Sequence, residues 1–181
     1  MSPLHGALAE CRADAARNRG NAKSLMLVLG YRSASLAYKA GLERPVVAML
    51  TLPLRVAYKI GIEWVCGCEL PPSTDVGAGL RIFHGQGLVV HPRTVIGRNV
   101  TLRHNTTIGA IAVGAERLAP VICDRVDVGA NATVLGGVRI GTGAVVGAGS
   151  VVVSDVPDGA TVVGNPARLV EGVDHVGGPA H

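Results

Sequence analysis

Residues 122–152 read ICDRVDVGANATVLGGVRIGTGAVVGAGSVV, and every sixth residue in this stretch is an isoleucine or a valine. These aliphatic positions are Ile122, Val128, Val134, Ile140, Val146 and Val152. The fifth residue of each hexad is also small or apolar, namely Val126, Ala132, Val138, Ala144, Ser150 and Val156. Glycines follow several of the aliphatic residues, and glycine accepts turn conformations that β-branched residues resist. A fixed internal period of this kind is typical of solenoid proteins.

The same period continues toward the N-terminus with two interruptions. Its earlier positions are Leu70, Val76 and Ile82, then, after a shift of two residues, Val90, Ile96, Leu102 and Ile108. Residues 109–121 fit no hexad, and this break predicts a loop that projects from one corner. Three hexads, each one strand and one turn, would close a triangular coil whose aliphatic side chains stack inward on those of the next coil. The period therefore predicts a parallel β-helix rather than a sandwich rich in valine and glycine.

Before residue 68 the apolar residues recur at helical spacing instead. This spacing predicts one helix over 25–37 and a second over 46–64, with Pro53 kinking the second helix or delaying its start. We therefore expect three parts: an N-terminal helical segment over 1–67, a β-helix domain over 68–168 and a flexible tail over 169–181.

The second helical segment is apolar enough to raise the question of a membrane span. Arg55, Lys59 and Glu63, together with Pro53, argue against a helix that crosses the bilayer. Two possibilities stay open. Residues 24–64 either pack against another subunit or make peripheral contact with a membrane as interfacial helices.

Composition narrows the function further. Hydrophobic residues make up 48% of the chain but aromatic residues only 3%, which indicates a core of stacked aliphatic side chains. The net charge of +4 favours an anionic cofactor, an acidic substrate or an anionic membrane surface. No basic face is interleaved with aromatic residues, so we expect no nucleic-acid partner. Cys66 and Cys68 are too close for a zinc knuckle, which predicts reduced thiols, no metal and a cytoplasmic protein.

Three further motifs accompany the hexads: GLRIFHGQGLVV at 79–90, TLRHNTTIGA at 101–110 and VVGNPARLV at 162–170. Together they resemble the hexapeptide-repeat acyltransferases, and most of all the serine acetyltransferase branch, over about residues 65–168. The resemblance implies a left-handed β-helix, a homotrimer that either stays single or pairs with a second trimer, and active sites between neighbouring helices. It also implies transfer of an acetyl group from acetyl-CoA to a hydroxyl.

The resemblance assigns the catalytic pair to His84 and Glu69. His84 lies in a His-x-x-Gly turn, and Glu69 stands fifteen residues earlier, where serine acetyltransferases place aspartate. A neutral imidazole can take the proton of an attacking hydroxyl near neutral pH. A carboxylate behind it would fix the tautomer and stabilise the imidazolium that forms.

The resemblance also suggests binding residues. For acetyl-CoA these are Gly109, Ala110, Ala130 and Ala148 along the pantetheine arm and Arg168 at a phosphate; corner packing and a surface salt bridge are the structural roles that compete with these. For the acceptor they are His104, Arg103 and Arg117.

The chain departs from the serine acetyltransferases at Leu118 and Ala119, where that branch carries an Arg-His pair that grips the amino-acid carboxylate. This departure favours the exopolysaccharide branch, such as the colanic-acid O-acetyltransferases. We therefore expect a sugar or glycan acceptor, for an enzyme working at the inner membrane face, with L-serine as the second possibility. Two functions without acetyl transfer also stay open: a metal-dependent anhydrase that uses His84, His91 and His104, and a scaffold. The spacing of the three histidines predicts that they lie on different corners.

Overall fold

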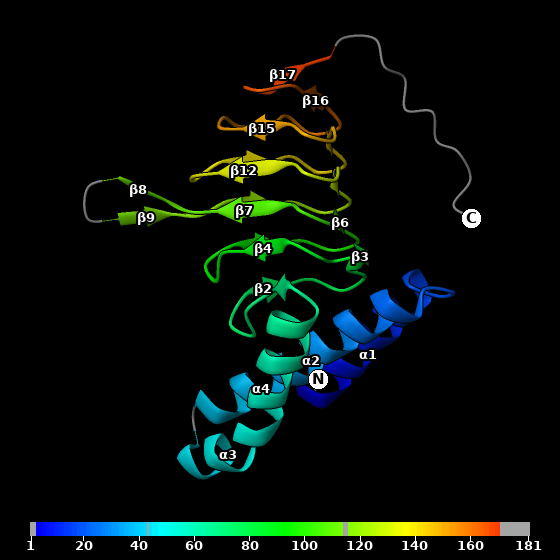
Figure 1. Cartoon of the computed structure of the whole chain (residues 1–181), viewed down its shortest axis with the longest axis vertical. Helices are drawn as coiled ribbons and strands as arrows, with labels where there is room; N and C mark the ends of the chain where they lie inside the picture. The colour runs from blue at the N-terminus through cyan, green and yellow to red at the C-terminus, as the bar shows by residue number, and fades with distance from the viewer. Residues whose placement is uncertain (1–2, 43, 114–115, 171–181) are drawn as a thin grey trace.

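The computed structural model describes residues 3–42, 44–113 and 116–170, and the side chains of residues 6–42, 44–112 and 118–170. They form a three-sided column of stacked coils standing on a base of helices (Figure 1). Most of the tail expected to be flexible, residues 171–181, lies outside the described residues.

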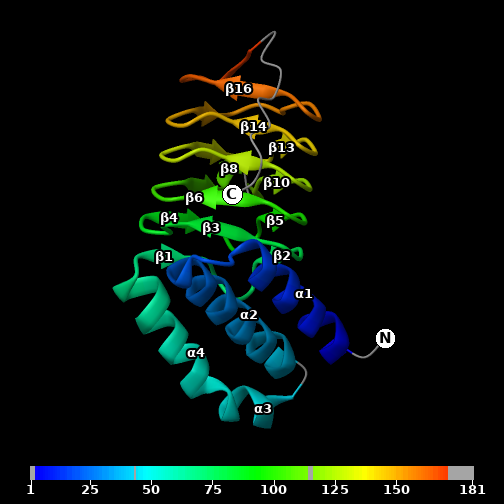
Figure 2. The same cartoon turned by 90° about the vertical axis from the view of Figure 1, so that its right-hand side faces the viewer.

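The base contains five helical elements. They are α1 (Pro3–Arg17), α2 (Ala22–Leu42), α3 (Pro45–Leu50), α4 (Leu52–Tyr58) and the π-helix η1 (Lys59–Val65). The helix predicted over 25–37 lies within α2. The predicted second helix is divided at Thr51, because Pro53 can be accommodated only in the first turn of a new helix. The helix α1 was not predicted. Figure 2 shows it side by side with α2 below the lowest coil.

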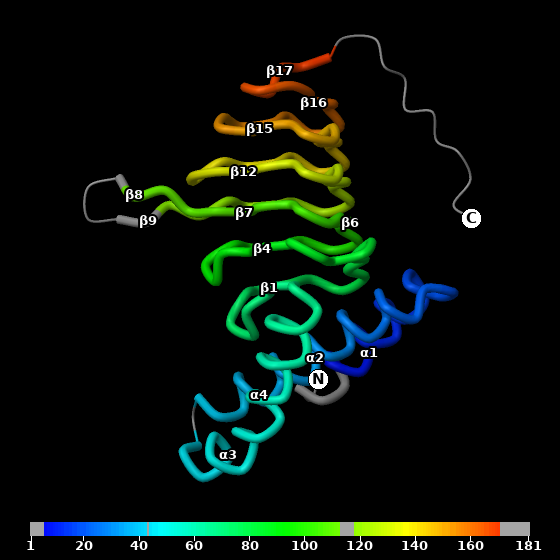
Figure 3. Tube along the Cα trace, in the orientation of Figure 1, coloured from blue at the N-terminus to red at the C-terminus, as the bar shows by residue number. Residues whose placement is uncertain are grey.

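The column has three faces, each a sheet that runs through successive coils (Figure 3). The first face contains β1 (Cys68–Glu69), β4 (Leu88–Val90), β7 (Thr107–Gly109), β12 (Thr133–Leu135) and β15 (Val151–Val152). The second contains β2 (Asp75–Val76), β5 (Val95–Ile96), β10 (Val121–Ile122) and β13 (Arg139–Ile140). The third contains β3 (Arg81–Phe83), β6 (Thr101–Arg103), β11 (Asp127–Val128), β14 (Val145–Val146), β16 (Thr161–Val163) and β17 (Arg168–Leu169).

The strands of neighbouring coils pair in parallel, except that β17 returns antiparallel to β16. On the second face, Val76, Ile96, Ile122 and Ile140 stand in one register. All the aliphatic hexad residues predicted to face inward are buried, and none exposes more than 4% of its surface. Burying each such side chain is worth about 1.5–3 kcal/mol. The prediction of a left-handed parallel β-helix with a helical N-terminal segment is confirmed.

The segment that fits no hexad leaves the column as a hairpin of β8 (Ile111–Val113) and β9 (Glu116–Leu118) (Figure 1). The predicted projecting loop is therefore confirmed. Its root packs closely on the next coil. A Cβ atom at Gly136 would lie 2.7 Å from Ile111 Cδ1, and one at Gly137 would lie 2.9 Å from Leu118 Cβ. Only glycine leaves room for the hairpin to approach here.

The helices close the lower end of the column. The hydroxyl groups of Tyr31 and Tyr58 donate hydrogen bonds to the carbonyl oxygens of Thr74 and Leu70, at 2.6 and 2.7 Å. Asn18 donates in the same way to the carbonyl of Leu80 at 2.8 Å. An open end of a β-helix would leave such backbone groups without partners. The helices satisfy them, and this fixes the position of α2 relative to the first coil. As a division into domains, the three parts expected from the sequence stay a prediction.

Candidate active site

The corner between the third and first faces carries two histidines in neighbouring coils. Between Ile82 and Val90 the chain has two residues more than a hexad requires, and the corner they enlarge begins at His84. His84 has a φ of 68°, in the left-handed region that non-glycine residues rarely adopt. His104 stands at the same corner one coil further along, because Phe83 and Arg103, which precede the two histidines, pair in register. The prediction that the histidines lie on different corners was wrong for this pair.

The two imidazoles meet edge to face, with ring centroids 5.6 Å apart and an interplanar angle of 77°. His84 is exposed and His104 is half-buried. The Nδ1 atom of His104 is buried and has no hydrogen-bond partner among the described residues. A buried nitrogen without a partner is uncommon in folded proteins. This corner therefore presents one solvent-accessible imidazole and one with unused hydrogen-bonding capacity.

Asparagines hold the corner in shape. Asn105 has a φ of 54°, its backbone N–H donates to the carbonyl of Gln86 at 2.7 Å, and its side-chain amide donates to Asn131 Oδ1 at 3.1 Å. Asn131, in the next coil, has a φ of 59°. Asparagine tolerates the left-handed region better than most residues. The backbone N–H of Asn131 also donates to the carbonyl of His104 at 3.1 Å, so the two asparagines link this corner in three successive coils.

A hollow of about 470 Å³ opens at this corner, lined by Lys23, His84, Gln86, His104 and Asn105. Its volume lies within the range of small-molecule sites, about 300–1,000 Å³. Four of the residues come from the corner, and Lys23 comes from the first turn of α2. The β-helix and its helical base thus build the hollow together. Sequence reasoning did not single out Lys23, Gln86 or Asn105.

Glu69 lies on β1 of the first face, exposed and in register with Val89 of β4. Among the described residues, no hydrogen bond or ion pair joins it to His84, and it does not line the hollow. The charge of Glu69 affects the pKa of Glu63. Burial raises the pKa of the Glu63 carboxyl, Lys59 lowers it, and the Glu69 charge raises it further. The pairing of Glu69 with His84 stays a prediction.

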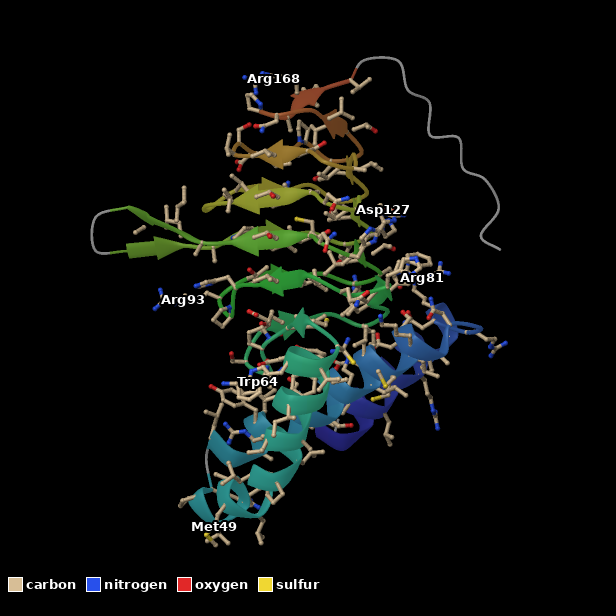
Figure 4. The ribbon with its side chains drawn as sticks, in the orientation of Figure 1. Met49, Trp64, Arg81, Arg93, Asp127 and Arg168 are labelled. Carbon is tan, nitrogen blue, oxygen red and sulfur yellow. The ribbon has the colours of Figure 1, made fainter. Side chains whose placement is uncertain are left out.

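The five residues expected at acetyl-CoA fall into three places. Ala130 and Ala148 stack at the histidine corner in later coils, where the carbonyl of Ala130 accepts a hydrogen bond from Gly149 at 2.9 Å. Gly109 and Ala110 lie at the other end of the first face, where the hairpin leaves. Arg168 is exposed on β17, at the end of the column far from the helices (Figure 4). Its guanidinium donates to the carbonyl of Ala167.

Of the two acceptor residues whose side chains the structure describes, His104 lines the hollow and Arg103 does not. Arg103 binds the carboxylate of Asp127, donates to the carbonyl of Val128 at 3.0 Å and lies 5.6 Å from the centre of the Phe83 ring. The side chain of Arg117, on β9, lies outside what the structure describes. His91 follows β4, at the corner between the first and second faces, and its Nδ1 accepts a hydrogen bond from the Arg93 N–H at 3.2 Å.

Two features of the described part of the chain bear on a metal site and on a membrane span. It contains no group of three or more His, Cys, Asp or Glu side chains placed to hold a metal ion. None of its helices is both long and apolar enough to cross a membrane.

A left-handed β-helix built from hexads defines a hexapeptide-repeat protein. The chain is 36% identical over 157 residues to the putative colanic acid biosynthesis acetyltransferase WcaB of Escherichia coli, covering 86% of this chain and 96% of WcaB. It therefore belongs to the hexapeptide-repeat acetyltransferases, the family of WcaB and the serine acetyltransferases. No family model matches the chain.

The serine acetyltransferases are similar over less of their own length. Serine acetyltransferase 4 of Arabidopsis thaliana is 37% identical over 152 residues, which is 84% of this chain but only 40% of the plant protein. Among solved structures, serine acetyltransferase from Brucella abortus in complex with coenzyme A superposes with a TM-score of 0.73 at 25% identity. That match covers 92% of this chain and 67% of the Brucella chain.

Proposed function

We propose that this protein transfers an acetyl group from acetyl-CoA to a hydroxyl of a sugar or glycan intermediate. The observation that carries the proposal is His84, an exposed imidazole held in the left-handed region beside a hollow of small-molecule size. Family membership supports the reaction type. WcaB, the putative colanic acid biosynthesis acetyltransferase that this chain matches over 96% of its length, supports the class of acceptor.

In the proposed mechanism His84 acts as the general base. Its neutral imidazole takes the proton of the acceptor hydroxyl as the oxygen attacks the thioester carbonyl. When the tetrahedral intermediate collapses, the C–S bond breaks and the imidazolium returns the proton to the departing sulfur. The transfer is direct and needs no nucleophile from the protein. Glu69 is the proposed positioning residue, acting through the orientation and charge of His84.

L-Serine is the second candidate acceptor, because many relatives are serine acetyltransferases. The hairpin argues against it. Leu118, which is 40% exposed, and Ala119 stand where the serine acetyltransferases carry their Arg-His pair. Neither side chain can form an ion pair with an amino-acid carboxylate.

For acetyl-CoA we propose the column of small residues above the histidines, Ala130 and Ala148, as the wall that the pantetheine arm follows. Gly109, Ala110 and Arg168 complete the proposed set. The coenzyme A complex of the Brucella relative supports acetyl-CoA as the donor. Small residues suit this role because a ligand can approach their backbone closely.

We further propose a homotrimer whose sites lie between neighbouring columns. The helical base exposes a set of large apolar residues, each at least 46% exposed: Val46, Met49, Leu50, Leu52, Leu54, Val56, Ile60, Trp64 and Val65. In Figure 4, Met49 lies at the lower end of the helical base and Trp64 lies nearer the first coil. Such a patch marks an interaction surface. This surface is compatible with contact to a second trimer and with peripheral contact of a cytoplasmic protein with the inner membrane.

An acceptor screen tests the proposal. Purified protein and acetyl-CoA are mixed with L-serine, L-homoserine, nucleotide-linked sugars or lipid-linked sugars, and release of the coenzyme A thiol is followed. We expect release above background only with sugar acceptors. Release with L-serine but with no sugar would favour L-serine as the acceptor. If none of the acceptors caused release above background, the proposed transferase activity would be rejected.

A further inference from the structure

Lys23 is the feature of the hollow that the proposed reaction leaves unexplained. It lines the hollow from α2, whereas the other four lining residues come from the corner, and a base-catalysed acetyl transfer requires no lysine. We propose that Lys23 binds an anionic group of the acceptor, so that the substrate is an acidic or phosphate-bearing saccharide rather than a neutral one. This inference rests on the proposed function and narrows its substrate class.

The charge of the lining favours an anionic ligand. Of the five lining residues, Lys23 is a cation, two are imidazoles and two are amides, and none is acidic. A ligand with a free ammonium group, such as an amino acid, would meet Lys23 without a compensating carboxylate in this lining. A carboxylate or a phosphate would meet the ammonium of Lys23 directly, as a charge-assisted hydrogen bond.

Lys23 differs from three arginines of the helices and the first coils, whose side chains bind other groups of the fold. Arg32 is paired with Asp14, Arg103 with Asp127, and Arg17 donates to the carbonyl of Gly79 at 2.6 Å. Within the described part of the chain, Lys23 forms no ion pair. These three arginines therefore serve the fold, whereas Lys23 is left for a ligand.

The remaining lining residues suit a hydroxylated ring. The amides of Gln86 and Asn105, which line the hollow, can both donate and accept hydrogen bonds. Hydroxyl groups also donate and accept, so a polyhydroxylated ring satisfies these groups better than a hydrocarbon chain does. One cation beside several two-way hydrogen-bonding groups is the recognition chemistry of an acidic sugar.

The first experiment measures anion binding directly. Inorganic pyrophosphate and methyl β-D-glucuronide are titrated into the protein while the ring-proton NMR signals of His84 and His104 are followed. We expect both anions to give saturable shifts of both rings, and Lys23→Met to weaken this binding by about tenfold or more, as losing a charged hydrogen bond does. Lys23→Arg should retain most of the affinity. Lys59→Met, which removes the same charge from exposed η1, is the matched control and should bind like the parent protein.

Three results would overturn the proposal: no saturable shift with either anion, equal binding by the parent and Lys23→Met, or methyl β-D-glucoside binding as tightly as the glucuronide. The two anions also separate a phosphate-bearing acceptor from a uronate, according to which one binds more tightly. Coenzyme A is the other source of phosphate. An unchanged coenzyme A affinity in Lys23→Met assigns Lys23 to the acceptor, and a weakened one would assign it to the donor and reject the inference.

The acceptor screen keeps this inference separate from the proposed function. Anion binding that depends on Lys23, without coenzyme A release in any screen, would reject the transferase but leave the anion site standing. Acetylation of neutral and acidic sugars with equal kcat/KM, unchanged in Lys23→Met, would confirm the transferase and reject the anion site.

Discussion

Asp14 and Arg32 form an ion pair buried between α1, α2 and the first coil, with Arg32 Nε 2.7 Å from Asp14 Oδ2. Asp14 is fully buried and Arg32 is 5% exposed. The carboxylate also accepts hydrogen bonds from the N–H groups of Gly79 and Leu80, at 2.7 and 2.9 Å. Arg32 donates to the carbonyls of Val76 and Gly77, at 2.7 and 2.6 Å. The pair therefore fastens both helices to one corner of the column.

Breaking this pair should destabilise the protein strongly. Asp14→Ala removes the buried carboxylate that balances the charge of Arg32 and leaves the N–H groups of Gly79 and Leu80 without an acceptor, so we expect a loss of about 3–5 kcal/mol in the free energy of unfolding. Glu10, the partner of Arg32 whose side chain is 43% exposed, gives the control. Glu10→Ala should cost less than about 1 kcal/mol. Urea unfolding followed by circular dichroism measures both, and equal losses would contradict the role of Asp14.

The inner stack should not tolerate a charge. Val134 is fully buried and in register with Ile108 and Val152 of the neighbouring coils, so Val134→Asp places an unpaired carboxylate among aliphatic side chains. We expect no folded protein in the soluble fraction. Val153 is 54% exposed, and Val153→Asp should give a normal yield and thermal transition. A folded Val134→Asp protein would show that the stack is not what holds the coils together.

His84 is best tested by asparagine rather than alanine. Asparagine tolerates the positive φ of this position, so His84→Asn removes the imidazole with little backbone strain. We expect the acetyl-transfer rate to fall by about a hundredfold or more, the range for losing a general base. His91→Asn, at another corner, should retain the parent rate. Turnover near the parent level in His84→Asn, with normal thermal stability, would remove His84 from the mechanism.

The positioning role of Glu69 calls for a double-mutant comparison. If the carboxylate acts through His84, Glu69→Gln should lower kcat by less than His84→Asn does. Adding Glu69→Gln to His84→Asn should then cause no further loss, because residues that act as a unit are not additive. An independent second loss in the double variant would show that Glu69 acts without His84.

Burial should protect one thiol from modification. Burial raises the pKa of Cys68 to about 12, with smaller contributions from the charges of Cys66 and Glu63. Because the raised pKa favours the neutral thiol, only about one part in ten thousand is thiolate at about pH 8. Iodoacetamide should therefore label Cys68 only after denaturation, while half-buried Cys66 reports access of the reagent. Peptide mass spectrometry reads both sites, and equal labelling in the native protein would contradict this.

The column was predictable because its core depends on a local rule. Each inward residue, such as Val134, lies six positions from the next, and burial follows from the period alone. The helix α1 obeys no such rule. The described hydrogen bonds from α1 to the column are made by polar Asp14 and Arg17, and the burial of Asp14 depends on Arg32 and on backbone groups distant in sequence. Apolar periodicity cannot reveal a helix held by a buried ion pair.

The site was predictable in part for the same reason. The motif assigned His84, which the structure places at the hollow, while its catalytic role stays a prediction. The contact between His84 and His104 was missed although the sequence contains the signal. The two histidines are twenty residues apart, which is three hexads plus the two-residue shift between Ile82 and Val90. The contribution of Lys23 leaves no sequence signal, because it depends on how α2 docks against the first coil.

The enlarged corner at His84 shows that the local sequence of a corner can change while the fold of the column stays the same. The strands of each coil pair with those of the neighbouring coils, and the hexads set their register. Two residues added at the His84 corner leave the pairing of β3 with β6 and of β4 with β7 intact. Insertions and substitutions at the corners can therefore alter a binding site without changing the three sheets. In such a fold, evolution can change acceptor specificity without first having to restore stability.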